Sequence, residues 1–190
     1  DAKIRELAKS VDVLTYEIEH INTDTLLDLE AQGMKIIPSP KVLQIIQDKG
    51  LQKHFYVNHK IKTAPYFIVN KTEDWSTCLG LIKGDKLAVK LCKGGYDGKG
   101  IALCDRQDLA NGIFPFDEPC MVEMYIPNVR ELAIIVARDQ MGGIKVFPEV
   151  EMFFNPTSNL VEFLFSPSRF NEDIIAKAKA LALKVVESFN

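Results

Sequence analysis

A glycine-rich loop between two apolar segments limits the fold of this chain more than any other feature. Residues 87–91 are mostly apolar and include Lys90, four glycines follow within residues 94–100, and apolar residues resume at Ile101. Glycines at this density allow backbone N–H groups to turn toward an anion and to approach it closely. The sequence therefore predicts a strand, a loop and a second strand that could together cover phosphate groups.

Two interpretations of this loop compete. It is not a Walker loop, because the pattern G-x-x-x-x-G-K-[ST] is missing and a strand, not a helix, is expected next. Glycine content alone favours a flexible hairpin turn, and Asp97 is a common turn residue. Lys90 and Lys99 bracket the loop and add positive charge, and Tyr96 has no packing role at a loop tip unless it closes over a ligand. These three residues favour phosphate binding.

Composition limits the remaining classes of protein. With 190 residues, 47% of them apolar and 26% charged, the chain is long enough for one ordinary globular domain or two small ones. The net charge of −3 does not favour a nucleic-acid or membrane partner, and no apolar run is long enough to cross a bilayer. Four widely spaced cysteines without a C-x-x-C pair indicate buried thiols in the cytoplasm.

The first 37 residues predict a small parallel unit. Residues 11–16 and 34–37 have strand composition, and residues 24–31 between them have helical composition, which makes a βαβ unit. Glu17 and Glu19 follow the first strand directly. Ligands bind at the carboxyl ends of such strands, so both carboxylates are candidates for a site.

A second part begins after the segment Pro38-Ser39-Pro40. Two short helices are followed by alternating strands, a pattern of α+β proteins, and the predicted division is 1–37 and 38–190. Both ends of the chain fall beside helix-like runs and look like cuts in a longer protein. The predicted helices are 41–48, 51–58, 73–79 and 173–188, and the predicted strands are 66–69, 87–91, 120–126, 131–137, 144–150 and 160–165.

Two glutamates could serve a nucleotide. A strand through Glu123 can present backbone groups to a purine edge, and Glu131, beyond the next turn, can accept hydrogen bonds from both ribose hydroxyls. Taken alone, the two residues are more simply explained as solvent-facing or as partners of Arg130 and Arg138.

Other polar residues give weaker signals. Lys49 and Lys53 on their own predict a solvated helix face. The three histidines share no metal-ligand spacing, and no metal site is predicted.

Together these pieces resemble 5-(carboxyamino)imidazole ribonucleotide synthase, the ATPase subunit of phosphoribosylaminoimidazole carboxylase, which is an ATP-grasp ligase of purine biosynthesis. The resemblance extends over essentially the whole chain. The segments that carry it are 15–20 (TYEIEH), 38–40, 47–49 with 52–53, 63–65, 94–100 (GGYDGKG) and 131–138.

The resemblance implies a fold and a reaction. The fold would be α/β and α+β: the tail of a parallel-sheet preATP-grasp domain, an antiparallel lid subdomain at about 65–126, and the start of the C-terminal part of the grasp. The reaction would use ATP, Mg²⁺ and bicarbonate to carboxylate 5-aminoimidazole ribonucleotide. The full-length protein would be a cytoplasmic homodimer.

The resemblance also assigns residues by position. Tyr96, Asp97 and Glu17 resemble residues that line the imidazole ribonucleotide site, and they are the catalytic candidates. The candidates for nucleotide binding are two phosphate-binding lysines (Lys49, Lys90), the triphosphate loop (Gly95, Tyr96, Asp97, Gly98, Lys99, Gly100, Ile101), the adenine-reading strand (Glu123, Met124, Tyr125, Ile126) and the ribose carboxylate (Glu131).

Some features depart from the family pattern. Ile101 stands where many members have Gln, which leaves a backbone contact but no side-chain contact. Phe154 stands where many members have a His near the nucleotide, so the role of that His is not carried over. The family's magnesium ligands are expected downstream of Asn190, and the chain is therefore expected to be inactive alone. The alternatives are a purine-pathway ATP-grasp ligase that uses formate or glycine, and a nucleotide-binding module without catalysis.

Overall fold

The computed structural model describes residues 1–95, 99–155 and 160–189. Its first unit is the predicted βαβ arrangement. Strand β1 (Val13–Leu14) pairs in parallel with β2 (Lys35–Ile36), and α2 (Thr23–Ala31) connects them. Helix α1 (Ala2–Ala8) precedes this unit. The core is made of buried leucine and isoleucine side chains from both strands and two helices: Leu14, Leu26, Leu29, Ile36 and Leu43.

Two helices lead from this unit to the rest of the chain. Helix α3 (Pro40–Gln47) starts with Ser39 as N-cap and Pro40 in its first turn, as predicted. The break after it lies at Asp48, not at Gly50 as predicted. The Asp48 carboxylate accepts hydrogen bonds from the N–H groups of Gly50 (2.8 Å) and Leu51 (3.1 Å), which makes Asp48 the N-cap of α4 (Lys49–Asn58).

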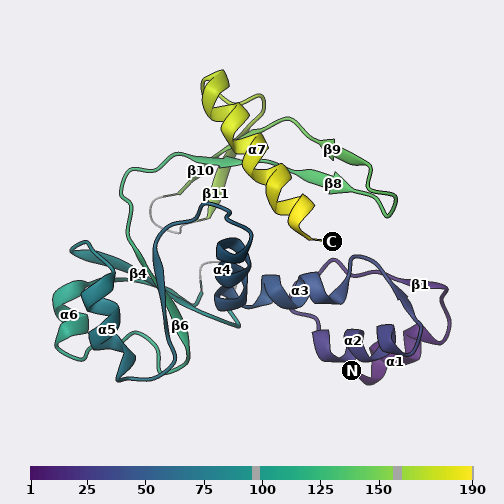
Figure 1. Cartoon of the computed structure of the whole chain (residues 1–190), viewed down its shortest axis with the longest axis horizontal. Coiled ribbons are helices and arrows are strands. Elements are labelled where there is room, and N and C mark those ends of the chain that lie inside the picture. The colour runs from purple at the N-terminus through teal and green to yellow at the C-terminus, as the bar shows by residue number, and fades with distance from the viewer. Residues whose placement is uncertain (96–98, 156–159, 190) are drawn as a thin grey trace.

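A four-stranded antiparallel sheet follows, in the order β3-β6-β4-β5. The strands are β3 (Tyr66–Val69), β4 (Lys86–Leu91), β5 (Ile101–Asp105) and β6 (Cys120–Met124), and β4 and β5 are the predicted pair on either side of the glycine loop. Figure 1 shows this sheet and the βαβ unit at opposite ends of the molecule, with α3 and α4 between them.

One face of this sheet packs against α5 (Asp74–Leu81) and α6 (Arg106–Ala110). The core between them holds Val89, Val122 and Leu109, and the Trp75 and Phe114 rings stack at 4.8 Å. Helix α6 was not predicted. Arg106 in this helix donates hydrogen bonds to the carbonyl oxygens of Gly84 and Leu79, both at 2.7 Å, which ties α6 to the end of α5.

The later strands are shorter than predicted. The run 131–137 divides into β7 (Glu131–Ala133) and β8 (Val136–Arg138), because β7 pairs with β10 (Val150–Phe154) whereas β8 pairs with β9 (Ile144–Val146). The predicted strand 144–150 is likewise wrong. Pro148 lacks an N–H group for a sheet ladder, and β9 ends before it while β10 begins after it.

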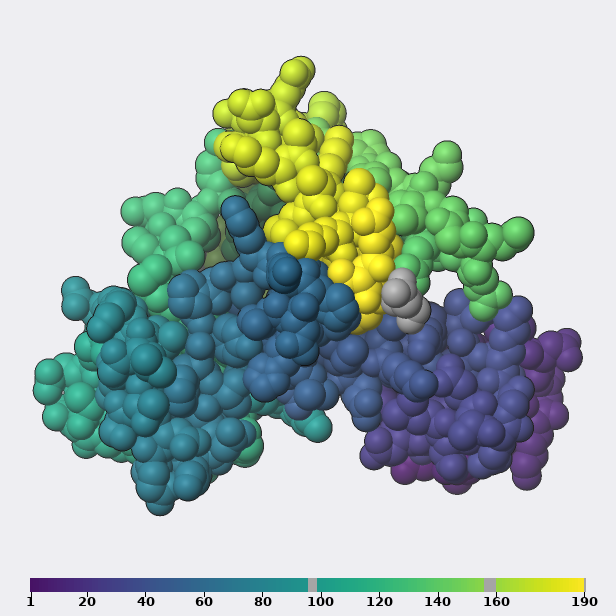
Figure 2. Space-filling view, viewed as in Figure 1, coloured from purple at the N-terminus to yellow at the C-terminus, as the bar shows by residue number. Residues whose placement is uncertain are grey.

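The last elements complete a three-stranded antiparallel sheet and its helix. The sheet has the order β11-β10-β7, with β11 at Val161–Phe165. Helix α7 (Glu172–Ser188) starts at Asn171, whose side chain accepts the N–H of Ile174 at 2.9 Å. Its end rests on α4 (Figure 2), where the Phe55 and Phe189 rings stack at 4.1 Å and Lys184 Nζ donates to the Lys60 carbonyl at 2.6 Å.

All four cysteines are free thiols; Cys78, Cys92 and Cys120 are buried as predicted, whereas Cys104 is only partly buried. Burial raises the pKa of Cys78 to about 11 and that of Cys120 to about 12. In the described part of the chain, no helix combines the length and apolar character needed to cross a membrane.

Candidate functional site

The sheet of β3, β6, β4 and β5 places a carboxylate in the middle of its second face. In the ladder, Glu123 of β6 lies between Tyr66 of β3 and Ala88 of β4. Because side chains alternate along a strand, Glu123 points away from the core that Val122 enters. Helix α4 covers this face, and Glu123 is only 6% exposed.

Glu123 holds two lysines. Its Oε2 accepts Lys90 Nζ at 2.7 Å, and its Oε1 accepts Lys53 Nζ, which also donates to the Thr63 hydroxyl. Burial alone would raise the pKa of Glu123, but hydrogen bonds and charge from both lysines outweigh it and hold the pKa below its usual value.

This arrangement corrects two interpretations made from the residues alone. Glu123 is neither solvent-facing nor an arginine partner, and Lys53 is 7% exposed, not part of a solvated helix face. The missed signal was spacing: Lys49 and Lys53 lie four residues apart and so share one side of α4.

The glycine loop closes tightly where the structure describes it. A Cβ at Gly95 would lie 2.8 Å from the Lys99 carbonyl oxygen, and one at Gly100, whose φ is +76°, would lie 3.0 Å from Gly95 Cα. The Gly100 carbonyl accepts the Leu91 N–H at 2.8 Å, which joins the loop to β4. Only glycine fits both arms of this closure. Tyr96, Asp97 and Gly98 lie outside the described residues.

Lys49 connects this loop to α4. Its backbone N–H donates to the Cys92 carbonyl at 2.9 Å, and its Nζ lies 3.7 Å from the position of a Cβ on Gly95. The structure therefore brings Lys49 and Gly95 together at the base of the loop. Lys90, one strand position before Leu91, pairs with Ile101 across the hairpin.

A cavity of about 270 Å³ lies between the βαβ unit and the loop. Gln47 at the end of α3 shapes one wall, because its side chain donates to the carbonyls of Ile21 (2.8 Å) and Glu19. Glu17 is exposed and is not among the residues that line the cavity, whereas Glu19 is. The lining also includes His20, Lys49, Lys93 and Gly95.

The proposed adenine residues begin inside β6, with Glu123 and Met124, and continue past its end, two residues before the end of the predicted strand 120–126. Strand β6 ends at Met124, and the side chains of Tyr125 and Ile126 are exposed beyond it. The Tyr125 N–H donates to the Lys86 carbonyl at 3.2 Å. Glu131 opens β7, where it pairs with Met152 of β10, and its side chain is exposed.

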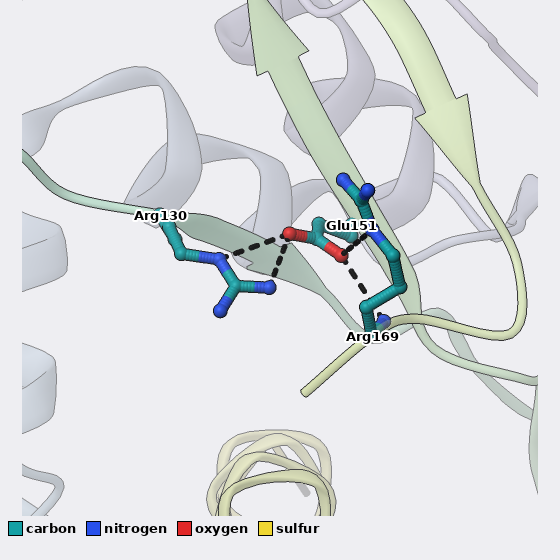
Figure 3. Close-up of polar contacts among 3 residues, drawn as sticks. All are labelled: Arg130, Glu151 and Arg169. Carbon is teal, nitrogen blue, oxygen red and sulfur yellow. Dashed lines mark hydrogen bonds and ion pairs between the residues drawn. The ribbon is translucent and has the colours of Figure 1, made fainter. Parts of the chain in front are cut away.

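Arg130, the residue before Glu131, is bound by the buried carboxylate of Glu151, to which the sequence analysis assigned no role. Glu151 lies between two arginines (Figure 3): it accepts Arg130 Nε at 3.0 Å and the Arg169 backbone N–H at 3.1 Å, and it is 1% exposed. Arg130 also lies 4.0 Å from the centroid of the Phe170 ring. Burial opposes ionisation, but the arginines hold the pKa of Glu151 below its usual value.

A second buried carboxylate, Glu149, pairs with Lys179 of α7 at 2.9 Å. The Lys179 hydrogen bond is the main reason that the pKa of Glu149 is lowered. Within residues 1–95, 99–155 and 160–189, no group of three or more His, Cys, Asp or Glu side chains could hold a metal ion.

Comparison with known proteins agrees with this architecture. The ribonucleotide synthetase preATP-grasp domain model matches residues 1–47, and the ATP-grasp domain model matches residues 54–190. The chain is 34% identical over 189 residues to a phosphoribosylaminoimidazole carboxylase from Ogataea methanolica, covering 98% of this chain and 34% of that protein.

Two solved structures share the fold. An N5-carboxyaminoimidazole ribonucleotide synthetase from Thermotoga maritima superposes with a TM-score of 0.80 at 32% identity, over 98% of this chain and 46% of the other. An N5-carboxyaminoimidazole synthase from Aspergillus clavatus, in complex with ADP and 5-aminoimidazole ribonucleotide, has a TM-score of 0.84 at 25% identity, over 100% of this chain and 49% of the other.

The chain spans about a third to a half of the length of these relatives. The domain boundary predicted after residue 37 stays a prediction. The family model covers most of the chain, and the expected combination of a parallel unit with antiparallel sheets is confirmed. The chain belongs to the ATP-grasp family.

Proposed function

We propose that this chain carries the nucleotide-binding part of an ATP-dependent carbon–nitrogen ligase of purine biosynthesis. The ligase joins bicarbonate to the amine of 5-aminoimidazole ribonucleotide and forms 5-(carboxyamino)imidazole ribonucleotide. The observation that carries this proposal is the close approach of Lys49 to the glycine loop, beside a cavity that Glu19 also lines. The relative that binds both ADP and 5-aminoimidazole ribonucleotide has the same fold, which supports the choice of ligands.

Each residue has a role in the proposal. Lys49 and Lys90 contact phosphate, since ammonium groups make charge-assisted hydrogen bonds to phosphate oxygens. The backbone of the loop from Gly95 to Ile101 covers the triphosphate, the strand end 123–126 contacts adenine, and Glu131 accepts the ribose hydroxyls. Tyr96, Asp97 and Glu17 are proposed for the imidazole ribonucleotide side, with Glu19 added because it lines the cavity.

The proposed chemistry has two steps. An oxygen of bicarbonate attacks the γ-phosphorus of ATP, and ADP leaves. The amine nitrogen of 5-aminoimidazole ribonucleotide then attacks the carboxyl carbon of the carboxyphosphate, and phosphate leaves with the bonding electrons. The nitrogen loses a proton in this second step, so charge and atoms balance.

Magnesium belongs to the proposal as the ion that commonly accompanies ATP. Its fit to this chain is poor, because Glu149 and Glu151, the buried carboxylates near β10, are committed to Lys179, Arg130 and Arg169. We therefore assign no magnesium ligand among the described residues. A cytoplasmic location and a homodimer of the full-length protein are also part of the proposal.

Calorimetry with the purified 190-residue chain tests the binding part. We expect ATP to bind, and Lys49→Ala to weaken it. We also expect 5-aminoimidazole ribonucleotide to bind, and Glu19→Ala to weaken that second ligand more than ATP. Binding of ATP alone would favour a nucleotide-binding module, and failure of both ligands would refute the proposal. A substrate screen of the full-length protein with bicarbonate, formate and glycine separates the carboxylase from the two other ligases.

A further inference from the structure

Lys53 is a buried lysine to which the proposed function gives no role. It lies in the middle of α4, and its Nζ contacts the Glu123 carboxylate and the Thr63 hydroxyl. The Tyr66 ring lies beside it, 5.6 Å from Nζ to the ring centroid. Burying a lysine costs free energy unless its charge is paired, and Glu123 provides the pairing for Lys53.

Lys53, Lys90 and Glu123 form a charged cluster in which the two lysines bind different oxygens of the carboxylate and differ in exposure. Lys53 occupies Oε1, whereas Lys90 occupies Oε2 at 2.7 Å. The Lys90 side chain is 29% exposed, against 9% for Lys53. The Lys90 side chain is therefore the more accessible of the two to solvent or a ligand. The cluster carries one net positive charge.

We propose that Lys53 is a positioning residue that keeps Glu123 neutralised, so that Lys90 can move its ammonium group from Glu123 to the phosphates of a bound nucleotide. This inference rests on the proposed nucleotide site. When Lys90 leaves Oε2, Glu123 still has a hydrogen-bonded counter-charge on Oε1, and the carboxylate is not left alone in a buried place.

Removal of Lys53 would favour Glu123 over phosphate in the competition for the Lys90 ammonium group. Glu123 would then have Lys90 as its counter-charge, and phosphate would have to displace Lys90 from a buried carboxylate. An uncompensated Glu123 would also repel phosphate directly, since like charges at short range are unfavourable in a low dielectric. Lys53 would thus act on phosphate affinity without touching the nucleotide.

The first test measures ATP and adenosine binding by calorimetry on the 190-residue chain. Lys53→Met keeps the length of the side chain and removes its charge. We expect it to weaken ATP binding about 10- to 150-fold, the range of one charge-assisted hydrogen bond. Adenosine, which has no phosphate, should bind within about twofold of wild type. Thr63→Val is the matched control, because it removes a hydrogen bond from Lys53 but keeps its charge on Glu123, and it should leave ATP binding nearly unchanged.

The second test asks whether the effect passes through Glu123. In a Glu123→Gln background no carboxylate holds Lys90, so adding Lys53→Met should change ATP affinity by less than about twofold. If Lys53→Met alone does not fold, Glu123→Gln can still be compared with Lys53→Met/Glu123→Gln, because the double variant leaves no buried carboxylate without a counter-charge. Circular dichroism identifies folded variants.

The outcomes separate this inference from the proposed function. If the wild-type chain binds neither ATP nor adenosine, the nucleotide site itself is wrong. If it binds ATP but Lys53→Met weakens ATP and adenosine equally, or weakens ATP equally in both backgrounds, Lys53 has only a structural role and the inference is overturned.

Discussion

Closure of the glycine loop can be tested by adding one methyl group at different positions. Gly100→Ala meets two obstacles. Its φ of +76° is strained for alanine, which costs about 1–2 kcal/mol, and its Cβ would lie 3.0 Å from Gly95 Cα and 3.1 Å from Leu91 Cδ1. Crowding of this kind typically costs about 1–3 kcal/mol more. We therefore expect a total loss of about 2–5 kcal/mol of unfolding free energy.

Gly94 and Gly112 provide matched controls. Both have positive φ, +81° and +83°, but a Cβ at either position would have no neighbour within 4 Å. Alanine there costs only the strain of about 1–2 kcal/mol. Gly112 lies after α6, away from the loop, and so also controls for effects on ligand binding.

Thermal melts followed by circular dichroism measure the difference. For a chain of this size 1 kcal/mol shifts Tm by about 2–4 °C, so Gly100→Ala should lower Tm by about 4–20 °C and the controls by about 2–8 °C. ATP affinity should fall for Gly100→Ala and not for Gly112→Ala. If Gly100→Ala were no more destabilising than Gly94→Ala, the close approach of the two loop arms would be refuted.

Three further predictions address the candidate site and the core of the βαβ unit. Lys90→Ala should weaken ATP binding about 10- to 150-fold in calorimetry, because a charge-assisted hydrogen bond to phosphate is lost; unchanged affinity would remove Lys90 from the site. Because the pKa of Glu123 is lowered in the folded state, its contribution to stability is fully present above the ordinary glutamate pKa of about 4.3 and is lost as pH falls through the lower folded-state pKa. Urea titrations across this pH window should show a smaller loss of unfolding free energy for Glu123→Gln than for wild type. Leu26→Ala, at a fully buried position, should cost about 2–5 kcal/mol in urea unfolding, whereas Leu7→Ala, at a half-exposed position, should change stability by less than about 0.5 kcal/mol.

Local patterns predicted the elements whose signals lie within a few residues. The βαβ unit, the Ser39-Pro40 helix start, the hairpin around the loop and α7 all depend on nearby composition and capping, and the structure confirms them. One strand error, over 144–150, overlooked a local signal, Pro148, whereas the other came from tertiary pairing. Residues 131–138 have continuous strand composition, but only the ladder partners reveal that the run belongs to two sheets.

Side-chain partners far apart in sequence could not be predicted in this way. Lys53 and Glu123 are separated by 70 residues and meet only because α4 packs on the sheet face. Arg130 likewise reaches Glu151 only because β7 pairs with β10, and Arg169 only because the chain returns after β11. In both groups the sequence contains the charges, but their pairing follows from how the helices and strands pack together in the fold.

Helix α4 is the element on which these separate parts converge. Its first residue donates to the Cys92 carbonyl at the base of the loop, its middle holds Lys53 on Glu123, and Phe55 near its end stacks on Phe189 after α7. Asp48 joins it directly to α3, which contributes Leu43 to the core of the βαβ unit. A rotation of α4 would therefore move Lys49 relative to Gly95 and Lys53 relative to Glu123 at the same time. Lys49, which we propose contacts phosphate, and Lys53, which pairs with Glu123, are coupled because helix α4 carries both, one turn apart.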